Sequence, residues 1–435
     1  MRRASIAAVL LASSAGGAAF GQGFEGSTIT ATVSERFEAN DNYDLDDPSP
    51  GTSYFADTRL TLGFLNQTPT QNFELGFSTG LRALWQAEQP FEFTLASPTG
   101  ASLDYDNAWA DGLFDMSFDY RQRQVDYTEA ISADDDPNQL PDDLSQLQNN
   151  TREMRYDANI GVAFGTSTPS SYELRFIGSQ VDYTDVTPDQ VPRSTLEGQA
   201  AWNLQFNPIL ASRVTGDYLY YNADNSDQTE LRRASVGAGV VYTPDVNTSL
   251  GLGVNYADRQ RKDLVNDALE TTESNNGPGI TGEFSYTTEE LVFSGEGEWS
   301  SAAPTTRLSG TVRAVYTLPR GRVIGRVFQN YTGTSGGSDE ARVTGLGIGL
   351  TRELTSVSSI GFDFRYATQV DVDDGPGPLD PDINRTDFTA TYSHAITSTI
   401  DADIGYSYRT RSEEPTDASS NAVFVQIGKS FETRP

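Results

Sequence analysis

Strict alternation between apolar and polar residues is the most regular feature of this chain. It is clearest from Ile360 to Tyr366, and it returns from Ile400 to Arg409. A period of two predicts β-strands with one apolar and one polar face. The polar face carries charged side chains such as Asp363, Arg365 and Asp401. The pattern therefore predicts a sheet whose two faces meet very different surroundings.

Short and long connections alternate along the chain after Ser27. The short ones carry Pro, Asn or Thr, and we predict nine of them, near Asn66–Gln71, Asp106–Gly112, Gly165–Ser171, Phe206–Ala211, Thr243–Asn247, Thr287–Glu290, Leu318–Gly321, Arg352–Ser358 and His394–Ser398. The longer ones are rich in Asp, Gly and Ser, and the clearest are Asn40–Ser53, Val125–Thr151, Arg259–Gly279 and Val370–Asn384. Nine short turns, with both chain ends on their side, imply ten hairpins and about 20 strands. The ambiguous region Phe91–Tyr105 leaves about 18 or 22 strands as alternatives.

These features predict an all-β fold: a single transmembrane, antiparallel, up-and-down β-barrel with short periplasmic turns and long acidic extracellular loops. A soluble sandwich would need a matching second sheet to cover each apolar face. In a membrane barrel the apolar face turns to lipid, and the charged face turns to a wet lumen. Aromatic residues near strand ends fit an interfacial girdle, although ordinary β-propensity also enriches them.

The predicted lumen face carries charges of both signs, so that neighbouring strands can pair arginine with carboxylate. The candidate pore-lining residues are Arg59, Glu74, Arg82, Asp115, Asp119, Arg121, Arg155, Asp157, Arg175, Glu296, Arg313, Asp363, Arg365, Asp401 and Asp403. A barrel of this strand number is too wide for side chains to fill, so we expect water in the lumen.

The start of the chain resembles a secretory signal. Arg2 and Arg3 precede the apolar run Ile6–Ala12, and Ala19 and Gly21 supply the small residues that a signal peptidase needs. We expect a signal peptide at residues 1–21 and the barrel at residues 22–435. The chain has no cysteine, which excludes lipoprotein acylation, disulfides and thiolate metal sites. Its net charge of −31 argues against a nucleic-acid partner.

The C-terminal strand places Val423, Val425, Ile427 and Phe431 on one face. This ending resembles the terminal strand of Gram-negative outer-membrane barrels, which the barrel assembly machinery reads. The whole chain is similar to porin-like barrels that are sometimes associated with exopolysaccharide. The resemblance implies an outer-membrane location, with lipid, lipopolysaccharide and the assembly machinery as partners.

One long acidic loop of general porins folds into the barrel and narrows it, and the longest loop here resembles it. Its carboxylates, the candidate constriction residues, are Asp134, Asp135, Asp136, Asp142 and Asp143. The alternative for this loop is a mobile surface segment.

Patterns with possible chemistry have simpler interpretations. Gly333–Gly337 matches the letters of a nucleophile elbow, but its flanks are strands and the single histidine, His394, is predicted at a turn on the other side. Glycines 345, 347 and 349 lie on the lumen face of one strand, where they permit bending or close approach. Asp41–Asp47 and Asp371–Gly375 resemble calcium loops but lack the EF-hand spacing, so solvated acidic loops are favoured over divalent-cation sites. We expect no enzymatic activity, no cofactor and no metal.

The sequence therefore favours an outer-membrane channel for passive diffusion of small polar solutes. The alternative is a barrel that serves exopolysaccharide export or envelope assembly. A secreted adhesin would show a fixed repeat, and none is visible. An active receptor with a plug is disfavoured because no plug-sized segment precedes Ser27.

Overall fold

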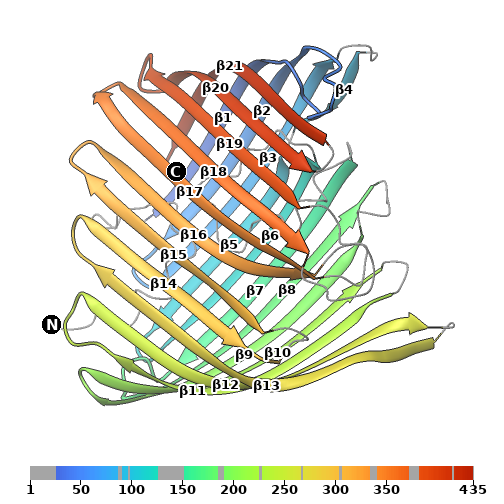
Figure 1. Cartoon of the computed structure of the whole chain (residues 1–435). Coiled ribbons are helices and arrows are strands. Elements are labelled where there is room, and N and C mark those ends of the chain that lie inside the picture. The colour runs from blue at the N-terminus through green and yellow to red at the C-terminus, as the bar shows by residue number, and fades with distance from the viewer. Residues whose placement is uncertain are drawn as a thin grey trace.

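The chain folds into one antiparallel β-sheet that closes into a wide barrel (Figure 1). The computed structural model describes residues 26–86, 91–96, 98–125, 151–184, 191–224, 228–265, 268–302, 306–333, 340–371, 382–413 and 416–434. Its strands are β1 (Gly26–Asn40), β2 (Ser53–Gln67), β3 (Gln71–Trp85), β4 (Glu92–Leu95), β5 (Thr99–Trp109), β6 (Gly112–Val125), β7 (Thr151–Phe164), β8 (Ser170–Tyr183), β9 (Arg193–Asn207), β10 (Leu210–Ala223), β11 (Glu230–Tyr242), β12 (Thr248–Val265), β13 (Ala268–Thr287), β14 (Leu291–Ser300), β15 (Arg307–Leu318), β16 (Gly321–Gly333), β17 (Glu340–Thr355), β18 (Ser358–Asp371), β19 (Ile383–Ala395), β20 (Ile400–Glu413) and β21 (Thr416–Thr433). The described residues include no helix of the length and hydrophobicity that a membrane crossing requires.

Closure of the sheet depends on β1, which pairs with β2 on one side and with β21 on the other. Each remaining strand pairs with its neighbours in chain order, so 20 strands form the ring and β4 is an extra short strand. β4 and β5 both pair with β3, β4 at Leu81–Leu84 and β5 at Gln71–Ser78. The prediction of about 20 strands is confirmed, and the ambiguous region corresponds to this interrupted pairing along β3.

The connections follow the predicted alternation with two exceptions, β12–β13 and β20–β21, where only two residues separate the strands on the side of the long connections. All nine predicted short turns join successive strands. The predicted loop Arg259–Gly279 is wrong, because β12 and β13 continue as a paired hairpin through this region and extend beyond the neighbouring strands (Figure 1). Arg259 Nη1 donates to Glu273 Oε1 at 2.9 Å across this hairpin. Polar cross-strand contacts support the pairing here. Because this part of the hairpin has no apolar alternation, its strands cannot be recognised in the sequence.

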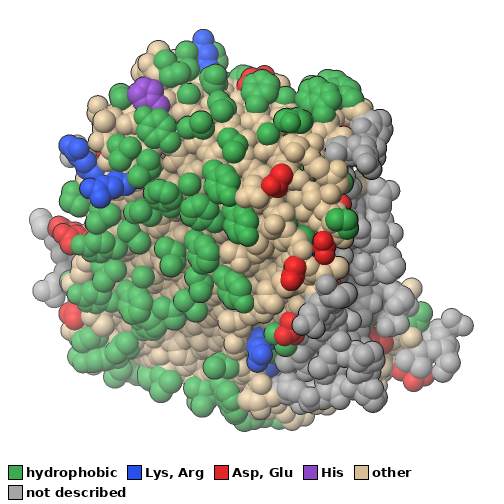
Figure 2. All heavy atoms as spheres, turned by 45° about the horizontal axis from the view of Figure 1, so that its top comes forward, with side chains coloured by type: hydrophobic (Ala, Val, Ile, Leu, Met, Phe, Trp, Pro, Cys, Tyr) green, Lys and Arg blue, Asp and Glu red, His purple; other side chains and the backbone are tan. Residues whose placement is uncertain are grey.

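The two faces of the wall differ as the alternation predicts. On β18, Phe362 and Phe364 are 41% and 37% exposed, whereas Arg365, between Phe364 and Tyr366, is 9% exposed. Hydrophobic side chains spread over the outer wall (Figure 2). The charged face is therefore the inner face of the barrel.

Close packing on the inner face explains one of the predicted glycines. Gly345 of β17 lies opposite Phe328 of β16, whose side chain is 6% exposed. A Cβ atom at Gly345 would lie 2.5 Å from the Phe328 ring, so the close approach requires glycine.

We predict that Gly345→Ala destabilises the barrel by about 1–3 kcal/mol, because the added methyl group overpacks the site under Phe328. Gly325→Ala on the neighbouring strand is the matched control, since a Cβ there meets nothing within 4 Å. Urea unfolding followed by tryptophan fluorescence gives both values. Equal unfolding midpoints would contradict the packing argument.

Candidate functional site

Arginine supplies all the positive charge on the inner wall that the structure describes. The chain has two lysines, Lys262 and Lys429, and both occupy outward positions of their strands. Arginine presents a planar fork of donors that matches a carboxylate in two-point contact, whereas lysine acts as a point charge. The wall is therefore suited to ordered ion pairs.

Ion pairs on the wall have two geometries. In the first, arginine and carboxylate are two residues apart on one strand, as in Arg155–Asp157 at 2.8 Å and Arg385–Asp387 at 2.8 Å. Because side chains two apart share a face, this spacing is visible in the sequence. In the second, the partners lie on neighbouring strands, as in Arg123–Glu153 at 2.9 Å. The sequence cannot give such a pair without the strand register.

Several of the candidate pore-lining residues are brought together in pairs. They are Arg155 with Asp157 at 2.8 Å, Arg175 with Asp115 at 3.4 Å, Arg121 with Asp119 at 3.7 Å, Arg365 with Asp363 at 3.7 Å, and Arg82 and Arg59 with Asp57 at 2.8 and 3.8 Å. The candidates Glu74, Glu296, Arg313, Asp401 and Asp403 also occupy inward strand positions. Glu74, Asp401 and Asp403 lie near the short turns, whereas Glu296 and Arg313 lie near the middle of their strands. That these residues line a pore stays a prediction.

Not all of the most buried charges are among the candidate pore-lining residues. Asp387 is 4% exposed and lies opposite Arg365 on one side and Arg409 on the other. Arg385 also donates from Nε to the Asp387 carboxylate. One carboxylate thus stands among three arginines. The repeated Arg-x-Asp spacing could have revealed Arg385 and Asp387, but not their burial.

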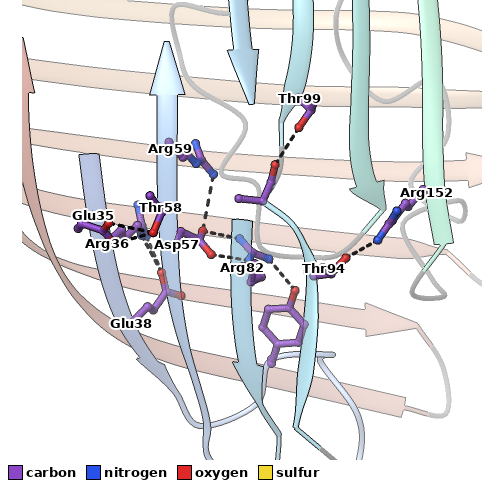
Figure 3. A network of polar contacts seen from close by, with 12 residues as sticks. Glu35, Arg36, Glu38, Asp57, Thr58, Arg59, Arg82, Thr94, Thr99 and Arg152 are labelled. Atoms are coloured by element: carbon purple, nitrogen blue, oxygen red, sulfur yellow. Dashed lines mark hydrogen bonds and ion pairs between the residues drawn. The ribbon is translucent and has the colours of Figure 1, made fainter. Parts of the chain in front are cut away.

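A second buried group joins three elements near the long connections. Arg82 of β3 donates from Nε and Nη2 to the two carboxylate oxygens of Asp57 of β2, at 2.8 and 2.9 Å (Figure 3). Its Nη1 donates to the hydroxyl oxygen of Tyr43 at 3.0 Å. Asp57 and Tyr43 are each 1% exposed, and Phe55 packs against both Tyr43 and Arg82. Tyr43 belongs to the β1–β2 connection, so this ion pair holds a loop inside the barrel.

Some predicted features lie outside the described residues. They are the signal peptide at 1–21 and the constriction carboxylates Asp134, Asp135, Asp136, Asp142 and Asp143. Most of the nucleophile-like segment 333–337 and of the acidic segment 371–375 also lies outside them.

The remaining motif residues have structural partners. His394 lies near the end of β19, next to a short turn. Its ring stacks on that of Tyr392, with 6.4 Å between the ring centroids. The Asp41 carboxylate accepts hydrogen bonds from the backbone and side-chain nitrogens of Asn421 at 2.6 and 2.9 Å. Among the described residues, no three His, Cys, Asp or Glu side chains are grouped as a metal site would require.

We predict that Arg82→Met lowers the free energy of unfolding by about 3–5 kcal/mol, because it leaves Asp57 buried without its main partner. Arg434→Met is the control, since its pair with Glu432 is exposed and contributes roughly 0–1 kcal/mol. Chemical unfolding of both variants measures the difference. Similar losses for the two would show that the buried pair has no special role in stability.

Comparisons with known proteins give a fold but no family. No family model and no curated protein matches the chain. Among solved structures, the FrpB iron transporter from Neisseria meningitidis (F3-3 variant) matches with a TM-score of 0.50 and 7% identity, over 94% of this chain and 82% of that chain. The copper transporter OprC matches with a TM-score of 0.49 and 10% identity, over 94% and 83% of the two chains. At this identity the first likeness shows only that the fold, a large closed antiparallel barrel, is shared with FrpB.

Proposed function

We propose that this protein is an outer-membrane barrel through which small polar solutes diffuse passively. The observation that carries the proposal is the closed ring of 20 strands with an apolar outer wall and an inner wall of arginines and carboxylates. Closure leaves the backbone of the wall hydrogen-bonded, which a lipid environment demands. The charged interior has no use in a packed soluble core, but it suits a hydrated passage.

The outer wall supports the membrane location. Tyr172 and Trp202 stack at 6.3 Å near the short turns, and both are about half exposed. Trp85, Phe91 and Phe93 contact one another near the opposite end of the wall. Exposed aromatic residues at both ends of an apolar surface match the two girdles of a membrane barrel.

The inner wall supports diffusion of polar rather than apolar solutes. Carboxylates such as Glu74, Asp115 and Asp403 lie toward the short turns, whereas Arg82, Arg123 and Arg385 lie toward the long connections. A solute crossing the barrel would pass an acidic zone and an arginine-rich zone in succession. Such fixed charges select among hydrated solutes by sign and size.

Reconstitution in planar bilayers tests the proposal. We expect stepwise ion conductance. We also expect liposomes that contain the protein to swell in solutions of small neutral sugars, because the sugars enter through the barrel. A purified, folded barrel that gives neither signal would contradict passive diffusion, and it would favour the alternative of exopolysaccharide export or envelope assembly.

We further predict that Phe362→Arg impairs insertion, at a cost of about 2–4 kcal/mol if the side chain lies near the bilayer midplane. Thr391→Arg on the adjacent strand, β19, is the matched control. Thr391 occupies an inward position between Thr389, which lies opposite Asp363, and Ser393, which lies opposite Asp403. Cell fractionation and the gel shift between unheated and heated samples report insertion. Equal yields of folded, outer-membrane protein for the two variants would mean that the outer wall does not face lipid.

A further inference from the structure

The connection between β1 and β2, residues 41–52, does not behave as a surface loop. Asn42, Tyr43 and Leu45 are 3%, 1% and 4% exposed. The residues from Asp46 to Pro50 are exposed instead. A hairpin connection that stood in solvent would not bury a tyrosine and a leucine this completely. The first half of the loop is therefore packed inside the barrel.

Hydrogen bonds fix this half of the loop on the wall. Asn42 Nδ2 donates to the carbonyl oxygens of Asp46 at 2.8 Å and of Ser419, on β21, at 3.0 Å. The Asp46 backbone nitrogen donates back to Asn42 Oδ1 at 3.1 Å. On the other side, Arg82 donates to the Tyr43 hydroxyl, and Asp57 holds Arg82. The loop is thus held from both β21 and β3.

Leu45 lies in an apolar cluster that joins opposite walls. The buried members are Leu45, Val181 and Tyr183 of β8, Ala367 of β18 and Ile383 of β19. In the 20-strand ring, β8 and β18 are ten strand steps apart, which is half of the circumference. Side chains from facing walls cannot meet across a barrel of this strand number without something between them. The β1–β2 loop supplies that bridge.

The backbone at Leu45 adopts a conformation that is unfavourable for leucine. Its φ of 51° lies in the left-handed region, which disfavours a leucine side chain. Its backbone nitrogen donates to the Asn42 carbonyl oxygen at 3.3 Å, closing a tight turn. The residue keeps this conformation because its side chain is buried between the walls.

We propose that the β1–β2 loop is the size filter of the barrel, with Leu45 as the residue that determines the width of the passage near the long connections. The proposal rests on the passive-diffusion function and adds to it an upper limit on the cross-section of the solute. Solutes that pass must fit beside the Leu45 bridge. Tyr43, Arg82, Asp57 and Asn42 hold the loop in place.

Leu45→Asn tests the filter directly. Asparagine tolerates the left-handed backbone but lacks the apolar side chain, so the turn is kept and the bridge is lost. Val246→Asn is the control, because Val246 lies in a short turn and is 87% exposed. Single-channel conductance and the largest polyethylene glycol that enters the channel are measured for wild type and both variants. For Leu45→Asn we expect higher conductance and a shift of the size limit to longer polymers, and for Val246→Asn no change.

Chemical cross-linking tests the bridge independently of conductance. The chain has no cysteine, so introduced cysteines are its only thiols. Leu45→Cys is combined with Val181→Cys and, separately, with Ile383→Cys, and the folded protein is treated with a short bismaleimide. We expect intramolecular cross-links in both pairs, and none when Leu45→Cys is combined with Val246→Cys.

The two experiments separate failure of the filter from failure of the channel. A conducting wild type whose conductance and size limit are unchanged by Leu45→Asn would overturn the filter and leave the channel intact. Absence of cross-links from Leu45 to either wall in the folded protein would also overturn it. Cross-linked bridges in a barrel that never conducts, with or without Leu45, would overturn the channel function and the filter role together.

Discussion

Hydrogen bonding between the first and last strands is the interaction on which the rest of this structure depends. β1 pairs with β21 from Ile29–Thr433 to Asn40–Ala422, so the ring closes through the two ends of the described chain. Closure satisfies the backbone groups that an open sheet would leave at its edges. The register of the closed ring also determines which side chains point inward, because a slip of one residue would exchange the inner and outer side chains of a strand. The ion pairs between neighbouring strands, such as Arg123–Glu153 and Arg82–Asp57, therefore exist only in this register.

Much of the fold could be predicted from the sequence, because alternation is strong wherever one face of a strand is apolar. The nine short turns and the strand number followed from this pattern. The hairpin of β12 and β13 could not be predicted beyond Asp258, because residues such as Arg259 and Glu273 face polar neighbours and the pattern of two contrasting faces fades. Strands specified by cross-strand polar contacts leave a weaker signal than strands specified by burial.

The candidate site was predicted less completely, for a different reason. Inward charges could be selected by their alternation, but their partners depend on register, so Arg82 was selected and Asp57 was not. The β1–β2 loop was interpreted as a solvated acidic segment because Asp41–Asp47 is mostly acidic. Tyr43 and Leu45 are the only apolar side chains in that segment. An interpretation based on the composition of the whole segment does not take account of these two positions. Two buried side chains decide where this loop lies, and a count over the segment cannot show that.

The use of arginine alone for the inward cations has a consequence for how the interior responds to acidity. A guanidinium group stays protonated throughout the pH range in which a folded protein survives, whereas a carboxylate loses its charge in acid. Acidification can therefore change the charge of the interior in one direction only, by weakening the acidic zone near the short turns. The arginine-rich zone keeps its charge while its carboxylate partners are neutralised. In the proposed channel, an acidic compartment would thus make the passage more attractive to anions, with no moving part and no histidine involved.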